Sequence, residues 1–335
     1  MKRISKGSVF IILPLIFGLW LWFSAESQPQ NQPAKKGSSS VSGQLTPQPT
    51  VAQNTPAVTT PGQTDTEQPA GQRTITAEQL LTELEAQAKE NNPRAMLLLG
   101  SLYERGINTT PKRNYGTALQ WYQKAAAQDL AEGHYNVGVY YEVGMGTAPD
   151  MKKAVASFQK AADKGLGIAE IKLASLYLIG DGVTQDTAKG LGLLEKAADK
   201  NIPQALLDLG AVYYFGNFDK KRDLTKAKEL FLKAADLGVP AAMQNLGVMA
   251  LAGEGMEANK VQGLRWYLLA QKYGLNNPEM QTTIDGIKAD FQAAEISAAE
   301  EEADKWSADF DAKVAAAQAA QQAAQEAAQA TAPAN

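Results

Sequence analysis

The sequence predicts an all-α protein, an α-solenoid of about five helix-turn-helix repeats with helical caps, preceded by a transmembrane helix and a disordered linker. Three observations lead to this prediction. One pattern recurs every 36 to 38 residues between residues 93 and 274. Within each half of that pattern, apolar residues are three to four apart, as in a short amphipathic helix. The chain before residue 74 is first apolar and then rich in Gln, Pro, Thr and Ser.

Residues 1–25 read as a cytoplasmic basic stub followed by a transmembrane signal anchor. Lys2, Arg3 and Lys6 precede an uncharged stretch, Gly7 to Ala25. This stretch is close to the ~20 apolar residues that usually cross a bilayer, and positive charge before it favours a cytoplasmic amino terminus. We therefore expect a single-pass protein of a bacterial inner membrane with its repeats in the periplasm. The alternative is a signal peptide that is cleaved, leaving a protein secreted to the periplasm.

Residues 26–73 contain almost no large apolar side chain. Such a segment cannot bury enough surface to offset the entropy lost on ordering, so we predict a disordered linker. Residues 74–92 are predicted to form an N-terminal capping helix, because Thr76 and Gln79 have the spacing of a capping box. Its apolar stripe consists of Leu80, Leu81, Leu84 and Ala88.

The repeats occupy residues 93–274. In each copy an apolar residue and a small residue are followed three positions later by Tyr or Ala; the five copies begin at Leu99, Val137, Leu173, Leu209 and Leu246. Every predicted helix end carries Gly, Asn or Asp, the residues that adopt a left-handed conformation most cheaply. These ends are Gly106, Asp129, Gly144, Gly165, Gly180, Asn201, Gly216, Gly238, Gly253 and Gly274. An aromatic residue or Leu on each second helix is expected to fill the space between helix pairs, at Trp121, Phe158, Leu194, Phe231 and Trp266.

This pattern resembles the Sel-1-like repeat family, a branch of the tetratricopeptide superfamily. The chain departs from the family pattern at Ala174, Ala250 and Asn201, and the fourth loop, residues 216–223, lacks the second glycine. The resemblance implies a right-handed α-solenoid whose concave side binds other proteins.

Two further segments follow the repeats. Residues 275–312 are predicted to be C-terminal capping helices, one beginning near Pro278 and one with a capping box at Ser297 and Glu300. Residues 313–335 form an Ala/Gln-rich low-complexity tail, which we expect to be either a frayed helix or disordered. A coiled-coil partner site in this tail is an alternative.

Composition restricts the chemistry. The net charge of -4 argues against nucleic-acid binding, and the absence of cysteine excludes disulfides, thiol nucleophiles and Cys-ligated metals. The one histidine, His134, sits at a variable position, which is Met96, Glu170, Leu206 or Met243 in the other repeats; this favours an ordinary surface or groove residue over a catalytic base. The Gly-x-Gly turns lack the strand and the Gly-Lys-Ser/Thr ending of a phosphate loop. We therefore predict no enzyme activity, no cofactor and no metal.

In tetratricopeptide-like arrays the first helix of each pair lines the groove. By that analogy the partner-binding residues are Leu97, Tyr135, Val139, Ile171, Leu178, Leu207, Tyr214, Val248 and Leu251. We expect them to bind an extended or helical segment of an envelope protein of unidentified sequence, unless closure of the superhelix or the C-terminal helix covers them. The predicted function is a non-enzymatic scaffold or regulator in the bacterial envelope. The alternative is a cell-wall or polysaccharide-associated binding factor, because Tyr135, Tyr140, Tyr141 and Tyr214 suit a glycan.

Overall fold

The computed structural model describes residues 76–106 and 111–330. The predicted anchor and linker, residues 1–25 and 26–73, lie outside this part. The described residues form thirteen α-helices and no strand. The helices are α1 Ala77–Lys89, α2 Pro93–Arg105, α3 Tyr115–Ala127, α4 Ala131–Val143, α5 Met151–Asp163, α6 Gly167–Ile179, α7 Thr187–Asp199, α8 Pro203–Phe215, α9 Leu224–Ala235, α10 Pro240–Ala252, α11 Lys260–Lys272, α12 Pro278–Ala289 and α13 Ala293–Ala330. Within residues 76–106 and 111–330, none of these helices is both long and apolar enough to cross a membrane.

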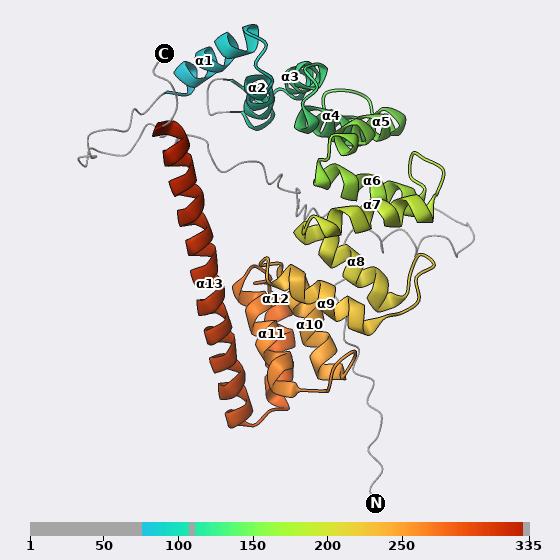
Figure 1. Ribbon diagram of the computed structural model, residues 1–335, viewed down its shortest axis with the longest axis vertical. Coiled ribbons are helices and arrows are strands. Elements are labelled where there is room, and N and C mark those ends of the chain that lie inside the picture. Colours follow the sequence, from blue (N-terminus) through green and yellow to red (C-terminus); the bar gives the residue numbers. More distant parts are fainter. Residues whose placement is uncertain (1–75, 107–110, 331–335) are drawn as a thin grey trace, which may run out of the picture. The chain divides into compact units, whose positions relative to one another are not determined.

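The helices form the predicted solenoid of stacked pairs (Figure 1). From α1 to α11, each helix packs mainly against the helices before and after it in the chain. The pairs α2–α3, α4–α5, α6–α7, α8–α9 and α10–α11 are the five repeats. No single repeat encloses its own core, because the buried residues of one pair also contact the next pair.

The N-terminal capping helix begins as predicted. The Thr76 Oγ1 accepts a 3.2 Å hydrogen bond from the Gln79 N–H, and the Gln79 Oε1 accepts a 2.9 Å hydrogen bond from the Thr76 N–H. These two bonds satisfy amide groups that the first turn of a helix leaves without partners. Helix α1 then covers the apolar face of the first repeat with Leu84 and Ala88.

The predicted helix ends are confirmed. All ten residues named above have positive φ, including Asp129 at 65° and Asn201 at 55°. In the fourth repeat, whose loop lacks the second glycine, Phe218 and Asp219 also have positive φ, at 54° and 61°. The loop therefore accepts two non-glycine residues in a conformation that ordinarily favours glycine.

Small residues on the first helices let aromatic rings of the second helices approach closely. A Cβ added at Gly138 would lie 2.6 Å from Phe158 Cε1, and a Cβ added at Gly210 would lie 2.6 Å from Phe231 Cε1. Both rings are almost completely buried. Such distances are shorter than any ordinary carbon contact, so these two positions need glycine.

In two repeats, the ring beside the small residue of the first helix is not the predicted gap-filling aromatic. The rings against Gly100 and Gly247 belong to Tyr122 and Tyr267, rather than to Trp121 and Trp266. Tyr122 and Tyr267 follow the small residue of their helix by four positions, as Phe158 and Phe231 do, whereas the tryptophans follow it by three. Because one residue turns a helix by about 100°, Trp121 instead packs with the core of α1 and α2, and Trp266 packs against Trp306 of α13.

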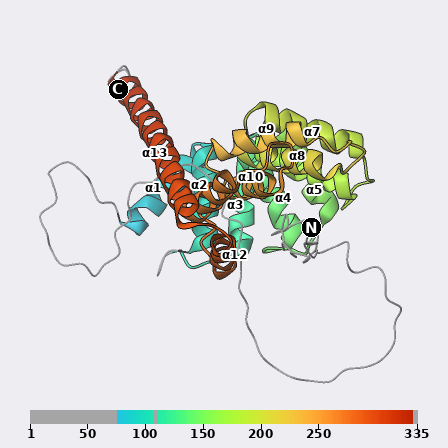
Figure 2. The same ribbon diagram turned by 90° about the horizontal axis from the view of Figure 1, so that it is seen from below.

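The C-terminal end differs from the prediction in its boundaries. Helix α13 begins at Ala293, where Glu295 Oε2 accepts a 2.8 Å hydrogen bond from the Gln292 N–H, so Ser297 is not a helix start but an exposed residue inside the helix. The rings of Trp306 and Phe310 stack on each other, with centroids 5.1 Å apart, on the side of α13 that packs near α11. The Ala/Gln-rich segment continues the same helix to Ala330, and α13 extends well beyond α11 (Figures 1 and 2).

Candidate partner-binding surface

The structure distributes the predicted groove residues over two environments. The apolar residue at which each copy of the repeat begins (Leu99, Val137, Leu173, Leu209 or Leu246) is called the landmark. The residues five positions after the landmark face the second helix of their own repeat. A Cβ added at Gly190 would lie 2.7 Å from Leu178 Cγ, and one added at Gly263 would lie 2.5 Å from Leu251 Cδ2. Leu178 is only 4% exposed, so it is part of the core and not of an open groove. The reason is helical geometry: this position lies four residues after the small residue that contacts the second helix.

Tyr214 occupies the same repeat position and is held by polar contacts. Its hydroxyl donates a hydrogen bond to Glu254 Oε2, and the Arg222 guanidinium forms a 2.7 Å ion pair with Glu254 Oε1. Burial, together with the nearby Glu254 carboxylate, raises the pKa of Tyr214 to about 12. The hydrogen bond from Tyr214, followed by the Arg222 contacts, lowers the pKa of Glu254 despite some burial. Because Glu254 belongs to the fifth repeat, this network joins two successive repeats.

The remaining predicted residues lie two positions before or after the landmark. Leu97, Tyr135 and Val139 are partly buried and pack against core clusters, with the Tyr135 ring 5.6 Å from that of Phe158. Ile171 and Leu207 are partly buried as well. Val248 is buried, with 8% of its surface exposed, and was wrongly expected to be accessible. None of these side chains lies fully open to solvent.

Sequence reasoning missed the most exposed apolar residues of the first helices. Val143, Ile179 and Phe215 are 61%, 41% and 49% exposed. Each lies six positions after the landmark, directly before the glycine that ends α4, α6 and α8. We call these three residues the apolar row. Its recurrence at a spacing of 36 residues was the available signal.

A charged pair lies beside the apolar row. Lys172 of α6 forms a 2.7 Å ion pair with Glu142 of α4, the residue that directly precedes Val143. The surface therefore combines exposed apolar side chains with a polar surround, as protein-binding surfaces do.

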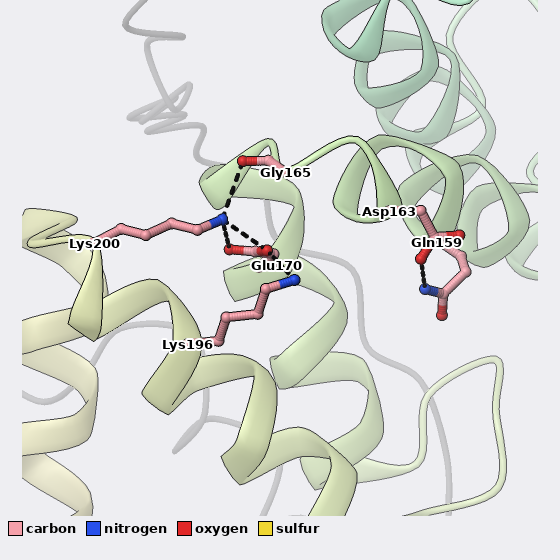
Figure 3. Close-up of polar contacts among 6 residues, drawn as sticks. All are labelled: Gln159, Asp163, Gly165, Glu170, Lys196 and Lys200. Carbon is pink, nitrogen blue, oxygen red and sulfur yellow. Dashed lines mark hydrogen bonds and ion pairs between the residues drawn. The ribbon is translucent and has the colours of Figure 1, made fainter.

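An ion cluster around one buried carboxylate lies within the third repeat and reaches the end of the second (Figure 3). Glu170 of α6 is completely buried, and its carboxylate oxygens contact Lys196 Nζ at 2.9 Å and Lys200 Nζ at 2.8 Å. Lys200 Nζ also donates a 3.2 Å hydrogen bond to the carbonyl oxygen of Gly165. Burial disfavours the ionised form, but the hydrogen bonds and charges of the two lysines outweigh it and lower the pKa of Glu170.

His134, which was expected on the surface or in the groove, is buried. It is 9% exposed and lines a cavity of about 700 Å³ formed by α3, α4 and α5. The same repeat position is buried in every copy, as Met96, Glu170, Leu206 and Met243. It faces the core because it lies three residues before the landmark, on the inner face of the first helix. Residues 76–106 and 111–330 contain no group of three potential metal-ligating His, Cys, Asp or Glu side chains.

The repeats also match a known family. The sequence model of the Sel1 repeat matches residues 93–130, 131–166, 167–202, 203–239 and 240–270, more than half of the chain. The chain belongs to the Sel1 repeat family. Proteins with Sel1 repeats generally mediate protein–protein interactions and are typically non-catalytic scaffolds.

Two solved structures resemble this Sel1 repeat chain. A Sel1 repeat protein from Oxalobacter formigenes is 30% identical, with a TM-score of 0.55 over 62% of this chain and 83% of its own. A protective antigen of uropathogenic Escherichia coli, described as displaying an SLR fold, is 31% identical, with a TM-score of 0.54 over 58% of this chain and 41% of its own.

Two curated proteins match shorter segments. An uncharacterized protein of Neisseria meningitidis is 38% identical over 78 residues, which is 23% of this chain and 16% of that protein. The Arabidopsis thaliana ERAD-associated E3 ubiquitin-protein ligase component HRD3B is 41% identical over 56 residues, 17% of this chain and 9% of its own length. The chain therefore spans less than a fifth of the curated relatives it matches.

Proposed function

We propose that this Sel1 repeat protein is a scaffold or regulator of a protein complex in the bacterial envelope, and that it holds a segment of its partner against the first helices of the middle repeats. The observation that carries the proposal is the apolar row. Exposed apolar side chains that recur along one edge of a repeat array favour a partner that runs along several repeats. The envelope location is proposed from the basic, then apolar, amino terminus.

A peptide or helix suits this surface better than a glycan does. Sugars stack on open aromatic faces, but Tyr140 is 1% exposed and its ring lies 5.2 Å from that of Tyr122. Tyr135 packs on Phe158, and Tyr214 is held by Glu254. The tyrosines that suggested a polysaccharide partner are thus largely occupied by contacts within the protein. The apolar row offers Val, Ile and Phe, which favour burial against another apolar surface.

The test uses a photo-activated crosslinking residue placed at Ile179 or at Phe215 in intact cells. We expect both positions to capture the same protein, because they are equivalent in adjacent repeats. The matched control is Leu232 of α9, which is 37% exposed but lies on a second helix. Identical capture from Leu232, or different proteins captured from Ile179 and Phe215, would count against a partner bound along the apolar row.

A second experiment tests the residues predicted from the sequence. The double variant Leu207→Asp, Tyr214→Ala should weaken capture through Ile179 if the partner extends to α8. Its helix content, measured by circular dichroism, serves as the folding control. The proposed location is tested separately by a reporter fusion after Gly71, which should be active only outside the cytoplasm. A reporter active in the cytoplasm would contradict the periplasmic placement.

A further inference from the structure

The second and third repeats place different groups between equivalent pairs of lysines. Lys196 and Lys200 follow Lys160 and Lys164 by 36 residues, the same interval that separates Glu170 from His134. In the third repeat, the two ammonium groups lie on either side of the buried Glu170 carboxylate, at 2.9 and 2.8 Å (Figure 3). The chain itself therefore shows that this pair of positions holds a carboxylate.

In the described part of the second repeat, no carboxylate contacts both lysines. His134 occupies the place of Glu170, and Lys164 forms an ion pair with Asp129 at the rim, where the Asp129 side chain is 73% exposed. The Lys160 ammonium makes no ion pair or hydrogen bond with another residue in the described part of the chain. A cationic side chain is thus left beside the interior position that Glu170 fills one repeat later.

The space that remains is the cavity of about 700 Å³ that His134 lines. Its apolar walls include Ala126 and Val137, and its rim carries Lys160 and Lys164. The His134 ring has one acidic neighbour among the described residues, Asp129, whose Oδ1 lies 3.8 Å from Nε2. A nearly buried imidazole that faces a cavity is a group that a ligand can contact with a hydrogen bond.

We infer that this cavity is a carboxylate-binding site, in which Lys160, Lys164 and the His134 ring hold a carboxylate supplied by a ligand in the position that Glu170 occupies in the next repeat. Charge-assisted hydrogen bonds of this kind are stronger than neutral ones. Asp129 and Asp163 on the rim repel additional negative charge, so the site suits a ligand that presents one carboxylate with an apolar neighbour. A free organic acid and the carboxylate of a peptide share this chemistry.

His134 reports directly on the site, because it is the only histidine in the chain. Burial, followed by the charges of Lys160 and Lys164, lowers the pKa of His134 against the opposing effect of Asp129. A bound carboxylate would place a negative charge beside the ring and raise that pKa. The groups that face the ring are Lys160, Lys164, Asp129 and Asp163.

The experiment is a titration of the full-length protein, purified in a mild detergent and carrying isotope-labelled histidine, followed by nuclear magnetic resonance. The ligands are acetate, a short peptide with a free C-terminal carboxylate, the same peptide amidated, and an amidated peptide with one internal Glu. Sodium chloride at equal ionic strength controls for screening. We expect saturable shifts of the single imidazole signal and a raised His134 pKa. The ligand that saturates at the lowest concentration identifies the source of the carboxylate.

Three variants test the assignment of residues. Lys160→Gln should weaken binding by roughly tenfold, the loss of one charge-assisted hydrogen bond. Lys196→Gln is the matched control, because its ammonium is already engaged by Glu170, and it should leave the titration unchanged. His134→Glu rebuilds the arrangement of the third repeat, so calorimetry should detect no carboxylate binding to it.

Shifts that match those in sodium chloride, or equal binding by natural protein and Lys160→Gln, would overturn the assignment. So would carboxylate binding by His134→Glu equal to that of the natural protein. The site does not depend on the proposed partner surface. A change of Ile179 or Phe215 to Asp should leave the His134 titration unchanged, so failure of either proposal is distinguishable from failure of the other.

Discussion

The close approach between the helices of one repeat predicts the effect of a single methyl group. In the variant Gly138→Ala, the new Cβ would lie 2.6 Å from Phe158 Cε1, 2.7 Å from Cδ1 and 3.0 Å from Cζ. The Phe158 ring is 0% exposed and also lies against Tyr135, so it has no free space into which to move. The helices must separate, or the ring must leave its preferred rotamer.

The magnitude follows from two opposing terms. Overpacking a well-filled core costs about 1–3 kcal/mol. Replacing Gly by Ala inside a helix favours folding by about 0.5–1 kcal/mol. Gly138→Ala should therefore lower the free energy of unfolding by up to about 2.5 kcal/mol, with a fall in Tm of about 2–4 °C for each kcal/mol in a domain of this size.

The matched control is Gly192→Ala. Gly192 lies inside α7, and a Cβ added there would meet no atom within 4 Å. In this variant only the higher helix propensity of Ala applies, so it should be more stable than the natural protein by about 0.5–1 kcal/mol. Urea denaturation followed by far-ultraviolet circular dichroism compares the two variants under one set of conditions. If Gly138→Ala were as stable as Gly192→Ala, the argument from close approach would be refuted.

The third repeat supplies a rescue variant. There the positions equivalent to Gly138 and Phe158 are Ala174 and Leu194, so an added methyl group occurs together with a smaller partner. The double variant Gly138→Ala, Phe158→Leu reproduces that combination. It should be more stable than the sum of the two single changes predicts, because each change fits the other. Strict additivity would show that the two residues do not compete for the same space.

Three further predictions concern other parts of the array. Glu170→Gln should lower the free energy of unfolding by about 1–3 kcal/mol at neutral pH, because two lysines lose their shared charged acceptor. Since the pKa of Glu170 is lowered in the folded state, this difference should be complete above its ordinary value of 4.5 and should vanish as the pH falls through the lowered folded pKa; a difference that grows in acid would contradict it. Gly180→Ala should cost about 1–2 kcal/mol, measured by urea denaturation, because Gly180 has φ 80° and an L-residue is strained there. Trp306→Ala should loosen α13, because its ring stacks on Phe310 and meets Trp266; limited proteolysis should then cut within residues 293–330 sooner than within α2–α10, and unchanged cutting would show that other contacts hold α13.

Local requirements could be predicted from the sequence because each depends on a few neighbouring residues. The ten helix ends were found because a left-handed residue strongly favours Gly, Asn or Asp, whatever lies around it. The capping box at Thr76 was found for the same reason, since its two hydrogen bonds span only three residues. The capping box expected at Ser297 was wrong because Glu295 provides an earlier start that the pattern did not distinguish.

The sequence predicted less accurately which side chains of neighbouring helices face each other. A shift of one residue turns a side chain by about 100°, so the sequence did not show that Tyr122 meets Gly100, and the prediction that Leu178 lines a groove was wrong because it packs on Gly190. The exposure of Val143, Ile179 and Phe215 likewise depends on how neighbouring repeats stack.

By itself, the sequence determined that this chain consists of stacked helix pairs, because a periodic apolar pattern with left-handed residues at its breaks leaves few other folds. Only the tertiary structure decided which side chains meet across those pairs. It brought the Glu170 carboxylate between two lysines, whereas the equivalent lysines beside His134 share no carboxylate and Lys164 pairs with Asp129 alone. The physical reason is that such contacts depend on the rotation and spacing of packed helices, and no local preference of the chain specifies either.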